Sequence, residues 1–134
     1  MPVLVTVDHE RREVTAVCVG PVTLADTMTL LDREVREEGV GYRKLFDTRG
    51  SGFEITEDEA HEIADALRAR SKGSKIGPAA MVVSSDAIFE LTLLIGRLTA
   101  DVCKIRPFRG VPEARAWLAS LEIQATDNAP NAKA

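Results

Sequence analysis

The chain has 134 residues, which is the size of one globular domain. Lys and Arg total 17 and Asp and Glu total 21, so the net charge is −4, and aromatic residues make up only 4%. These values argue against a nucleic-acid-binding protein, which needs a basic face and often aromatic rings for base stacking.

The N-terminal sequence has neither a basic segment nor a long apolar segment, so we expect no signal peptide and a cytoplasmic protein. No apolar run approaches the ~18 residues of a membrane span, which predicts no transmembrane segment. The two cysteines, Cys18 and Cys103, each lie in an apolar stretch and are expected to be reduced and buried. There is no CxxC motif or His/Cys cluster, so we expect no metal site and no cofactor.

The first half of the chain predicts a hairpin, a helix and a strand. Two β-rich runs, Val3–Val7 and Glu13–Val19, are joined by a short charged turn, as is typical of an antiparallel hairpin. Both faces of the second run are apolar, so we expect this strand to be covered on both sides. Thr23 is a candidate N-cap for the helix, and the strand over Tyr42–Phe46 is expected to end at Asp47.

The second half of the chain predicts three more helices and two more strands. Thr48–Ile55 is expected to be a loop, and Thr56–Glu59 is a capping box that starts the second helix. Ala79–Val83 is an apolar run typical of a strand in a parallel sheet. A third helix over about Ala87–Val102, a strand over Ile105–Phe108 and a last amphipathic helix follow.

The predicted order is therefore β-β-α-β-α-β-α-β-α. Strands that alternate with helices indicate a single α/β domain over residues 1–121, with a mixed, mostly parallel sheet flanked by helices. Residues 122–134 have little apolar content to bury, so we expect them to form a disordered tail.

Several short segments, read in this order, resemble the STAS superfamily and its SpoIIAA-like branch. They are Gly20–Thr23, Leu45–Asp47, Ala80–Val83 and Phe108–Leu118. The resemblance implies a SpoIIAA-like fold and a small non-enzymatic regulatory module. Anti-sigma-factor antagonists of this family carry a phosphorylated serine in an Asp-Ser-Ser-Gly segment at the start of the second helix. This chain departs from that pattern with Ile-Thr-Glu-Asp, which makes Thr56 the candidate phosphosite.

Polar side chains follow the ends of three predicted parallel strands, which is where ligands of open α/β sheets bind. They form a candidate ligand or partner edge that comprises Asp47, Arg49, Ser51, Ser84, Ser85, Asp86 and Arg109. Helix caps and strand ends use the same residue types, so a purely structural role is the alternative. His9 falls in the hairpin turn and His61 at the acidic start of the second helix. No nucleophile–base pair can be named, and we expect no enzyme activity.

The third helix carries more apolar surface than one contact with a sheet needs. One stripe comprises Ile88, Leu91, Ile95, Leu98 and Val102, and a second row, about 100° away, comprises Phe89, Leu93, Gly96 and Ala100. Three interpretations of the second row stay open. It packs against another helix of the domain, it forms a homodimer interface where Gly96 and Ala100 permit close approach, or it contacts an apolar ligand or a membrane surface.

The sequence thus predicts a non-catalytic cytoplasmic regulatory or protein-interaction module. The alternative is a carrier or sensor of a small apolar or lipid-like ligand, with membrane association through the third helix as one form of it. The acidic net charge weakens the membrane form, because anionic bilayers attract basic faces. The expected partners are another protein, a second copy of the chain or a lipid-like ligand, and not nucleic acid.

Overall fold

The computed structural model describes residues 3–36, 41–72 and 76–121, which form a five-stranded sheet in the order β1-β2-β3-β4-β5. β1 (Val3–Asp8) and β2 (Glu13–Val22) form the predicted antiparallel hairpin. β3 (Arg43–Phe53), β4 (Ala79–Val82) and β5 (Ile105–Phe108) continue the sheet in parallel. The predicted α/β class with a mixed, mostly parallel sheet is confirmed.

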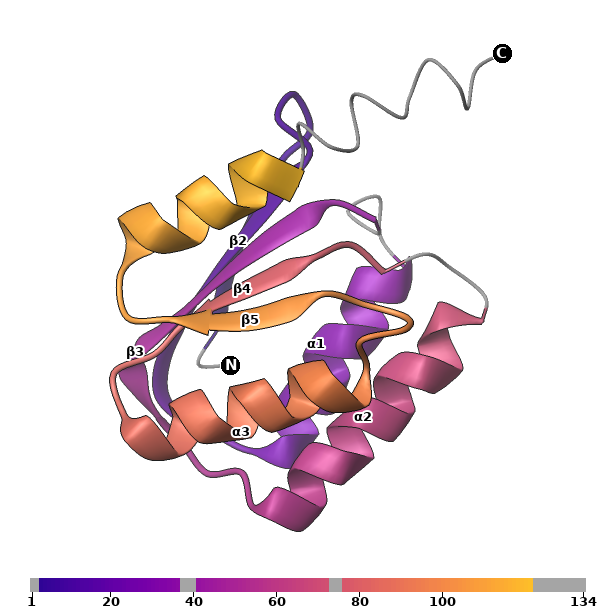
Figure 1. Cartoon of the computed structure of the whole chain (residues 1–134), viewed down its shortest axis with the longest axis vertical. Coiled ribbons are helices and arrows are strands. Elements are labelled where there is room, and N and C mark those ends of the chain that lie inside the picture. Colours follow the sequence, from indigo (N-terminus) through magenta and orange to yellow (C-terminus); the bar gives the residue numbers. More distant parts are fainter. Residues whose placement is uncertain (1–2, 37–40, 73–75, 122–134) are drawn as a thin grey trace.

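Three helices connect the parallel strands: α1 (Leu24–Arg36), α2 (Glu57–Ser71) and α3 (Asp86–Leu98). Each joins two neighbouring strands, so right-handed crossovers place all three on one face of the sheet. A fourth helix, over residues 111–121, lies on the opposite face (Figure 1). The tail predicted at residues 122–134 lies outside the described residues. No helix in the described part of the chain is long and apolar enough to cross a bilayer.

Local capping signals start the helices where the sequence predicted. Before α1, the Asp26 N–H donates to the Thr23 hydroxyl at 3.3 Å. Before α2, Thr56 and Glu59 form the full capping box, with side chain and backbone bonded reciprocally. Before α3, the Ser85 hydroxyl accepts the N–H three residues later at 3.1 Å. These bonds satisfy backbone donors that a helix start leaves unpaired.

The sheet separates two apolar cores, because successive strand residues point to opposite faces. Leu45 lies on the face of the 111–121 helix, where it packs with Ala114 and Leu118. That helix covers only part of its face, and Val17 and Val19 of β2 are 37% and 55% exposed. The prediction that β2 is covered on both sides is therefore wrong. The core on the face of α1–α3 contains Ile55, Ile63, Leu67, Ile76 and Cys103.

β3 is longer than predicted. We expected the strand to end at Asp47 and Thr48–Ile55 to form a loop, but the strand continues to Phe53. The additional residues pair in parallel with the end of β2, where Gly50 lies opposite Val19. The hydrogen bonds of this ladder outweigh the low strand propensity of the glycines in the segment.

α3 ends earlier than predicted, at Leu98 with Thr99 as C-cap instead of near Val102. Gly96 lies against β5, and a Cβ added there would be 2.6 Å from the carbonyl oxygen of Ile105. Gly96 therefore permits a close approach within the chain, between α3 and the edge strand. The homodimer interpretation of the second row stays a prediction. Ala100 is exposed beyond the end of α3.

Candidate functional site

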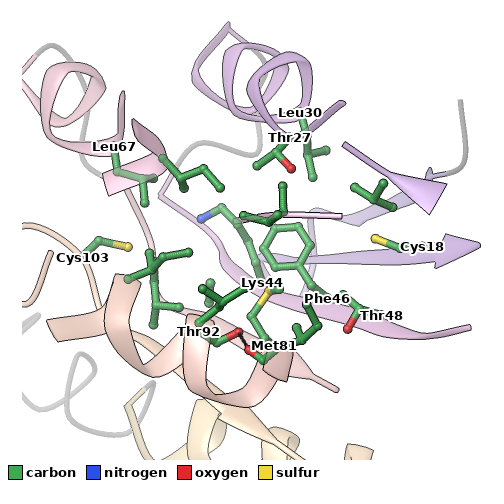
Figure 2. A pocket seen from close by; sticks show the side chains of 18 of the residues that line it. Cys18, Thr27, Leu30, Lys44, Phe46, Thr48, Leu67, Met81, Thr92 and Cys103 are labelled. Carbon is green, nitrogen blue, oxygen red and sulfur yellow. Dashed lines mark hydrogen bonds between the residues drawn. The ribbon is translucent and has the colours of Figure 1, made fainter. Parts of the chain in front are cut away.

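A cavity of about 110 Å³ lies between the sheet and the helices α1, α2 and α3 (Figure 2). Its walls are almost wholly apolar, and it is partly open to solvent. For comparison, an engineered apolar cavity of about 150 Å³ binds benzene. The space is thus large enough for a small apolar group.

The floor of the cavity consists of strand residues whose side chains point to the same face of the sheet. Cys18 of β2, Phe46 and Thr48 of β3, Met81 of β4 and Ile105 of β5 all line it. Phe46 and Met81 are opposite each other in the parallel register, so β3 and β4 present adjacent side chains to the same space. The floor therefore extends across four neighbouring strands.

α3 lines the cavity with its first apolar stripe and not with its second row. Ile88, Leu91, Thr92 and Ile95 are lining residues. The ligand interpretation assigned this role to Phe89, Leu93, Gly96 and Ala100, and none of these residues lines the cavity. The reason is that Gly96 packs on β5, which turns the first stripe toward the space between α3, α2 and the sheet.

Lys44 brings a charged side chain into this apolar surrounding. It lines the cavity and is only 2% exposed. Its Nζ donates to the carbonyl oxygens of Tyr42 at 2.8 Å and of Gly77 at 3.3 Å. These oxygens replace water as hydrogen-bond partners of the buried ammonium. The sequence patterns did not single out Lys44. Its position two residues before Phe46 could have indicated it, because alternate residues of a strand share one face of the sheet.

The hydroxyl groups in the walls all donate hydrogen bonds to backbone carbonyls of the protein. Thr27 and Thr92 each donate to the carbonyl four residues earlier in their own helix, at 3.0 and 2.8 Å. The Thr48 hydroxyl donates to the carbonyl of Val82 at 2.8 Å. These hydroxyl protons are therefore directed at backbone oxygens and not at the cavity.

Both cysteines line the cavity and are free thiols, as predicted. The Cys103 thiol donates to the carbonyl of Gly77 at 3.6 Å. Burial raises the pKa of the Cys18 thiol to about 11, and the Asp47 carboxylate adds to the shift. Because the thiolate is the reactive form of cysteine, Cys18 is a poor nucleophile at neutral pH.

The predicted ligand or partner edge is brought together only in part. Arg49 and Ser51 lie on β3 instead of in the predicted loop, and Asp47 lies within this strand instead of at its end. The Arg49 guanidinium donates to both carboxylate oxygens of Asp47, at 2.9 and 2.8 Å, and the Ser51 hydroxyl donates to the Thr48 carbonyl at 2.8 Å. The Ser84 hydroxyl donates to the Arg49 carbonyl at 3.4 Å, which joins this strand to the start of α3.

The other half of that edge surrounds Arg109. Its guanidinium forms an ion pair with Asp86, donates to the carbonyl of Ser84 at 3.4 Å and lies 4.7 Å from the centre of the Phe89 ring. Ser85 is the N-cap of α3. The charged groups at this edge are thus paired with one another, as the structural alternative expects. A role in binding a ligand or partner stays a prediction.

Thr56 lies at the exposed start of α2, where its hydroxyl accepts the N–H of Glu59 at 3.1 Å. Capping alone accounts for a threonine at this position. Phosphorylation of Thr56 stays a prediction. In the described ranges, no group of three or more His, Cys, Asp or Glu side chains is gathered in a way that could hold a metal ion.

The Asp47–Arg49 pair predicts a pH dependence of stability. Hydrogen bonds from the Arg49 side chain lower the pKa of Asp47 below its ordinary value of 3.8. The pair therefore stabilises the fold above that value, and the contribution is lost as the pH falls through the lowered pKa. An Asp47→Asn variant should unfold at a lower temperature than wild type at neutral pH, and the difference should vanish in acid. Thermal unfolding against pH measures this, with the exposed Glu90→Gln as control. A difference that persists unchanged in acid would contradict the prediction.

No family model matches the chain, and no curated protein matches it. Among solved structures, the chain is similar to an uncharacterised protein of the DUF3478 family with a SpoIIAA-like fold from Shewanella loihica PV-4. The similarity covers 87% of this chain and 91% of that chain, with a TM-score of 0.56 and 17% sequence identity. At this identity the similarity concerns the fold, and it agrees with the strand and helix order described above. The protein therefore has a SpoIIAA-like α/β fold, with a five-stranded, mostly parallel sheet and helices on both faces.

Proposed function

We propose that the protein is a non-catalytic binding module that holds a small apolar ligand between its sheet and the helices α1–α3. The observation that carries the proposal is the apolar cavity of about 110 Å³. The walls offer water few hydrogen-bond partners, and an ordered water needs two to four of them. A ligand with an apolar surface would replace this poorly bonded water and gain apolar burial.

The wall chemistry supports a binding role over catalysis. The hydroxyls of Thr48 and Thr92 donate to backbone carbonyls, and Cys18 is held as a neutral thiol. None of these groups is paired with a histidine, and both histidines are exposed at the surface. The proposal follows the carrier alternative of the sequence analysis. The protein-interaction module stays a prediction, because the charged residues at its expected edge bond to each other.

Native mass spectrometry of the protein purified from its own host tests the proposal. The wild type should carry extra mass that disappears on denaturation, and Leu91→Trp should lose it because the larger ring fills the cavity from α3. Leu4→Trp is the matched control, since Leu4 is 69% exposed on β1 and the same substitution there leaves the cavity unchanged. Leu4→Trp should retain the extra mass.

Native mass spectrometry detects only a ligand that stays bound during purification, so a second measurement uses added apolar probes. Benzene and hexanol should raise the unfolding temperature of wild type and of Leu4→Trp, but not that of Leu91→Trp. The proposal fails if the wild type carries no extra mass and neither probe changes its unfolding temperature. It also fails if Leu91→Trp folds and responds to the probes as wild type does.

A further inference from the structure

The first strand, β1, lies at an edge of the sheet. In the described part of the chain, β2 is the only strand hydrogen-bonded to it. The N–H and C=O groups on the outer side of β1 therefore belong to no ladder with another described strand. An edge of this kind is a template for a further strand, which continues the sheet through the same backbone hydrogen bonds.

The two edges of the sheet differ in how they are protected. At the other edge, β5 carries the exposed Arg106 followed by Pro107, which has no N–H to donate. A charge and a proline are two of the features by which proteins prevent edge-to-edge pairing. β1 has neither within Val3–Val7, and its register with β2 is unbroken, so no bulge distorts this edge. Strand addition is therefore opposed at β5 and unopposed at β1.

Apolar side chains lie beside the β1 edge. Leu4 of β1 is 69% exposed, and it lies opposite Val17 of β2, which is 37% exposed. Val19 follows on the same face of β2 at 55%. These are the exposed large hydrophobic side chains of the described residues, and all of them belong to β1 and β2. A strand added to β1 would cover part of Leu4 and gain apolar burial as well as hydrogen bonds.

The charge of β1 indicates which strand fits this edge. Val3–Val7 contains no charged residue, although 28% of the chain is charged. Cross-strand pairs of opposite charge are favourable, so an uncharged edge gives no advantage to a charged strand. The matching partner is an uncharged strand with apolar residues, and β1 is itself such a strand in every molecule. Two copies of net charge −4 repel each other, but contact along Val3–Val7 places no like charges opposite one another.

We propose that β1 pairs in antiparallel fashion with β1 of a second copy of the chain, so that two five-stranded sheets form one continuous sheet. Opposite residues of an antiparallel pair share one face, and a pair centred on Val5 matches all of Val3–Val7 with itself. Leu4 then lies opposite Thr6 of the second copy and diagonal to its Leu4, within reach of both. The two Asp8 carboxylates lie beyond the paired segment, about 20 Å apart along the strands.

Sedimentation velocity of the full-length protein over a range of concentrations tests the proposal. The contact is short, and small interfaces are weak, so we expect a dimer that dissociates on dilution. Leu4→Lys and Thr6→Glu should each raise the dissociation constant by about fivefold or more, because each places like charges on the diagonal across the dimer axis. Both side chains are exposed, and thermal unfolding establishes that both variants fold.

A mixture of the two variants tests the register. In the mixed dimer the introduced lysine faces the introduced glutamate, so the mixture should associate more tightly than either variant alone. Val19→Lys is the matched control, since Val19 is exposed on the same face but lies on β2, away from the edge. This variant should dimerise as wild type does.

A wild type that stays monomeric at every concentration would overturn the proposal. Unchanged dimerisation of Leu4→Lys and Thr6→Glu would also overturn it, because the copies would then meet through another surface, such as the second row of α3. A loss of dimer in Val19→Lys as large as in Leu4→Lys would place the contact on the face of the sheet instead of its edge. None of these outcomes bears on the apolar cavity, so the proposed function stands or fails separately.

Discussion

Replacement of Gly77 by alanine is expected to destabilise the fold by about 3 kcal/mol, at the upper end of the range for overpacking a buried site. Gly77 is buried just before β4. A Cβ added there would lie 2.6 Å from the carbonyl oxygen of Gly41 and closer still to that of Tyr42. Both are backbone atoms, so the clash cannot be relieved by rotation of a side chain. The segment before β4 would have to move away from the start of β3.

That displacement would also reach the cavity. The Gly77 carbonyl accepts hydrogen bonds from the Lys44 ammonium at 3.3 Å and from the Cys103 thiol at 3.6 Å. Gly77→Ala should therefore lower both the unfolding midpoint in urea and the affinity for an apolar probe such as hexanol.

Gly52→Ala is the matched control for this change. Gly52 is exposed on β3, and nothing lies within 4 Å of a Cβ added there. The same substitution should change stability by less than about 0.5 kcal/mol. Equal effects of the two substitutions would contradict the close approach described for Gly77.

Leu118→Ala is expected to cost about 2–5 kcal/mol, which is the range for truncation of a fully buried leucine. Leu118 is 2% exposed and packs with Leu45, Ala80, Val82 and Ala114 under the 111–121 helix. The substitution removes apolar burial and leaves a hole in this core. Urea-induced unfolding measures the loss.

The same variant separates stability from ligand binding. Leu118 lies on the face of the sheet opposite the cavity, so Leu118→Ala should bind hexanol with nearly the affinity of wild type while it is still folded. Leu4→Ala serves as control for stability, because Leu4 is 69% exposed and its truncation should cost less than about 0.5 kcal/mol. Loss of hexanol binding in folded Leu118→Ala would contradict the assignment of the two cores to separate faces.

Local signals were sufficient for most of the helix starts. Thr23 and Thr56 cap their helices as predicted, because a cap depends on residues within one turn of each other. The antiparallel hairpin was predictable for the same reason, since its two strands are joined by a short turn. The alternation of strands and helices then indicated the parallel sheet.

Contacts between distant segments decided the features that were missed. The extension of β3 to Phe53 depends on the β2 ladder beside it, and no pattern within Thr48–Phe53 indicates a strand. The exposure of Val17 and Val19 depends on which strands the 111–121 helix covers. Neither property can be read from residues close in sequence.

The sequence by itself therefore determined the fold class, the order of the elements and the capping residues, because periodicity and caps act over a few residues. Only the tertiary structure decided which stripe of α3 faces inward, because that depends on the contact of Gly96 with β5. It likewise decided that Lys44, Cys18 and Cys103 line one apolar space, since the separation between the helices and the sheet results from packing of the whole domain.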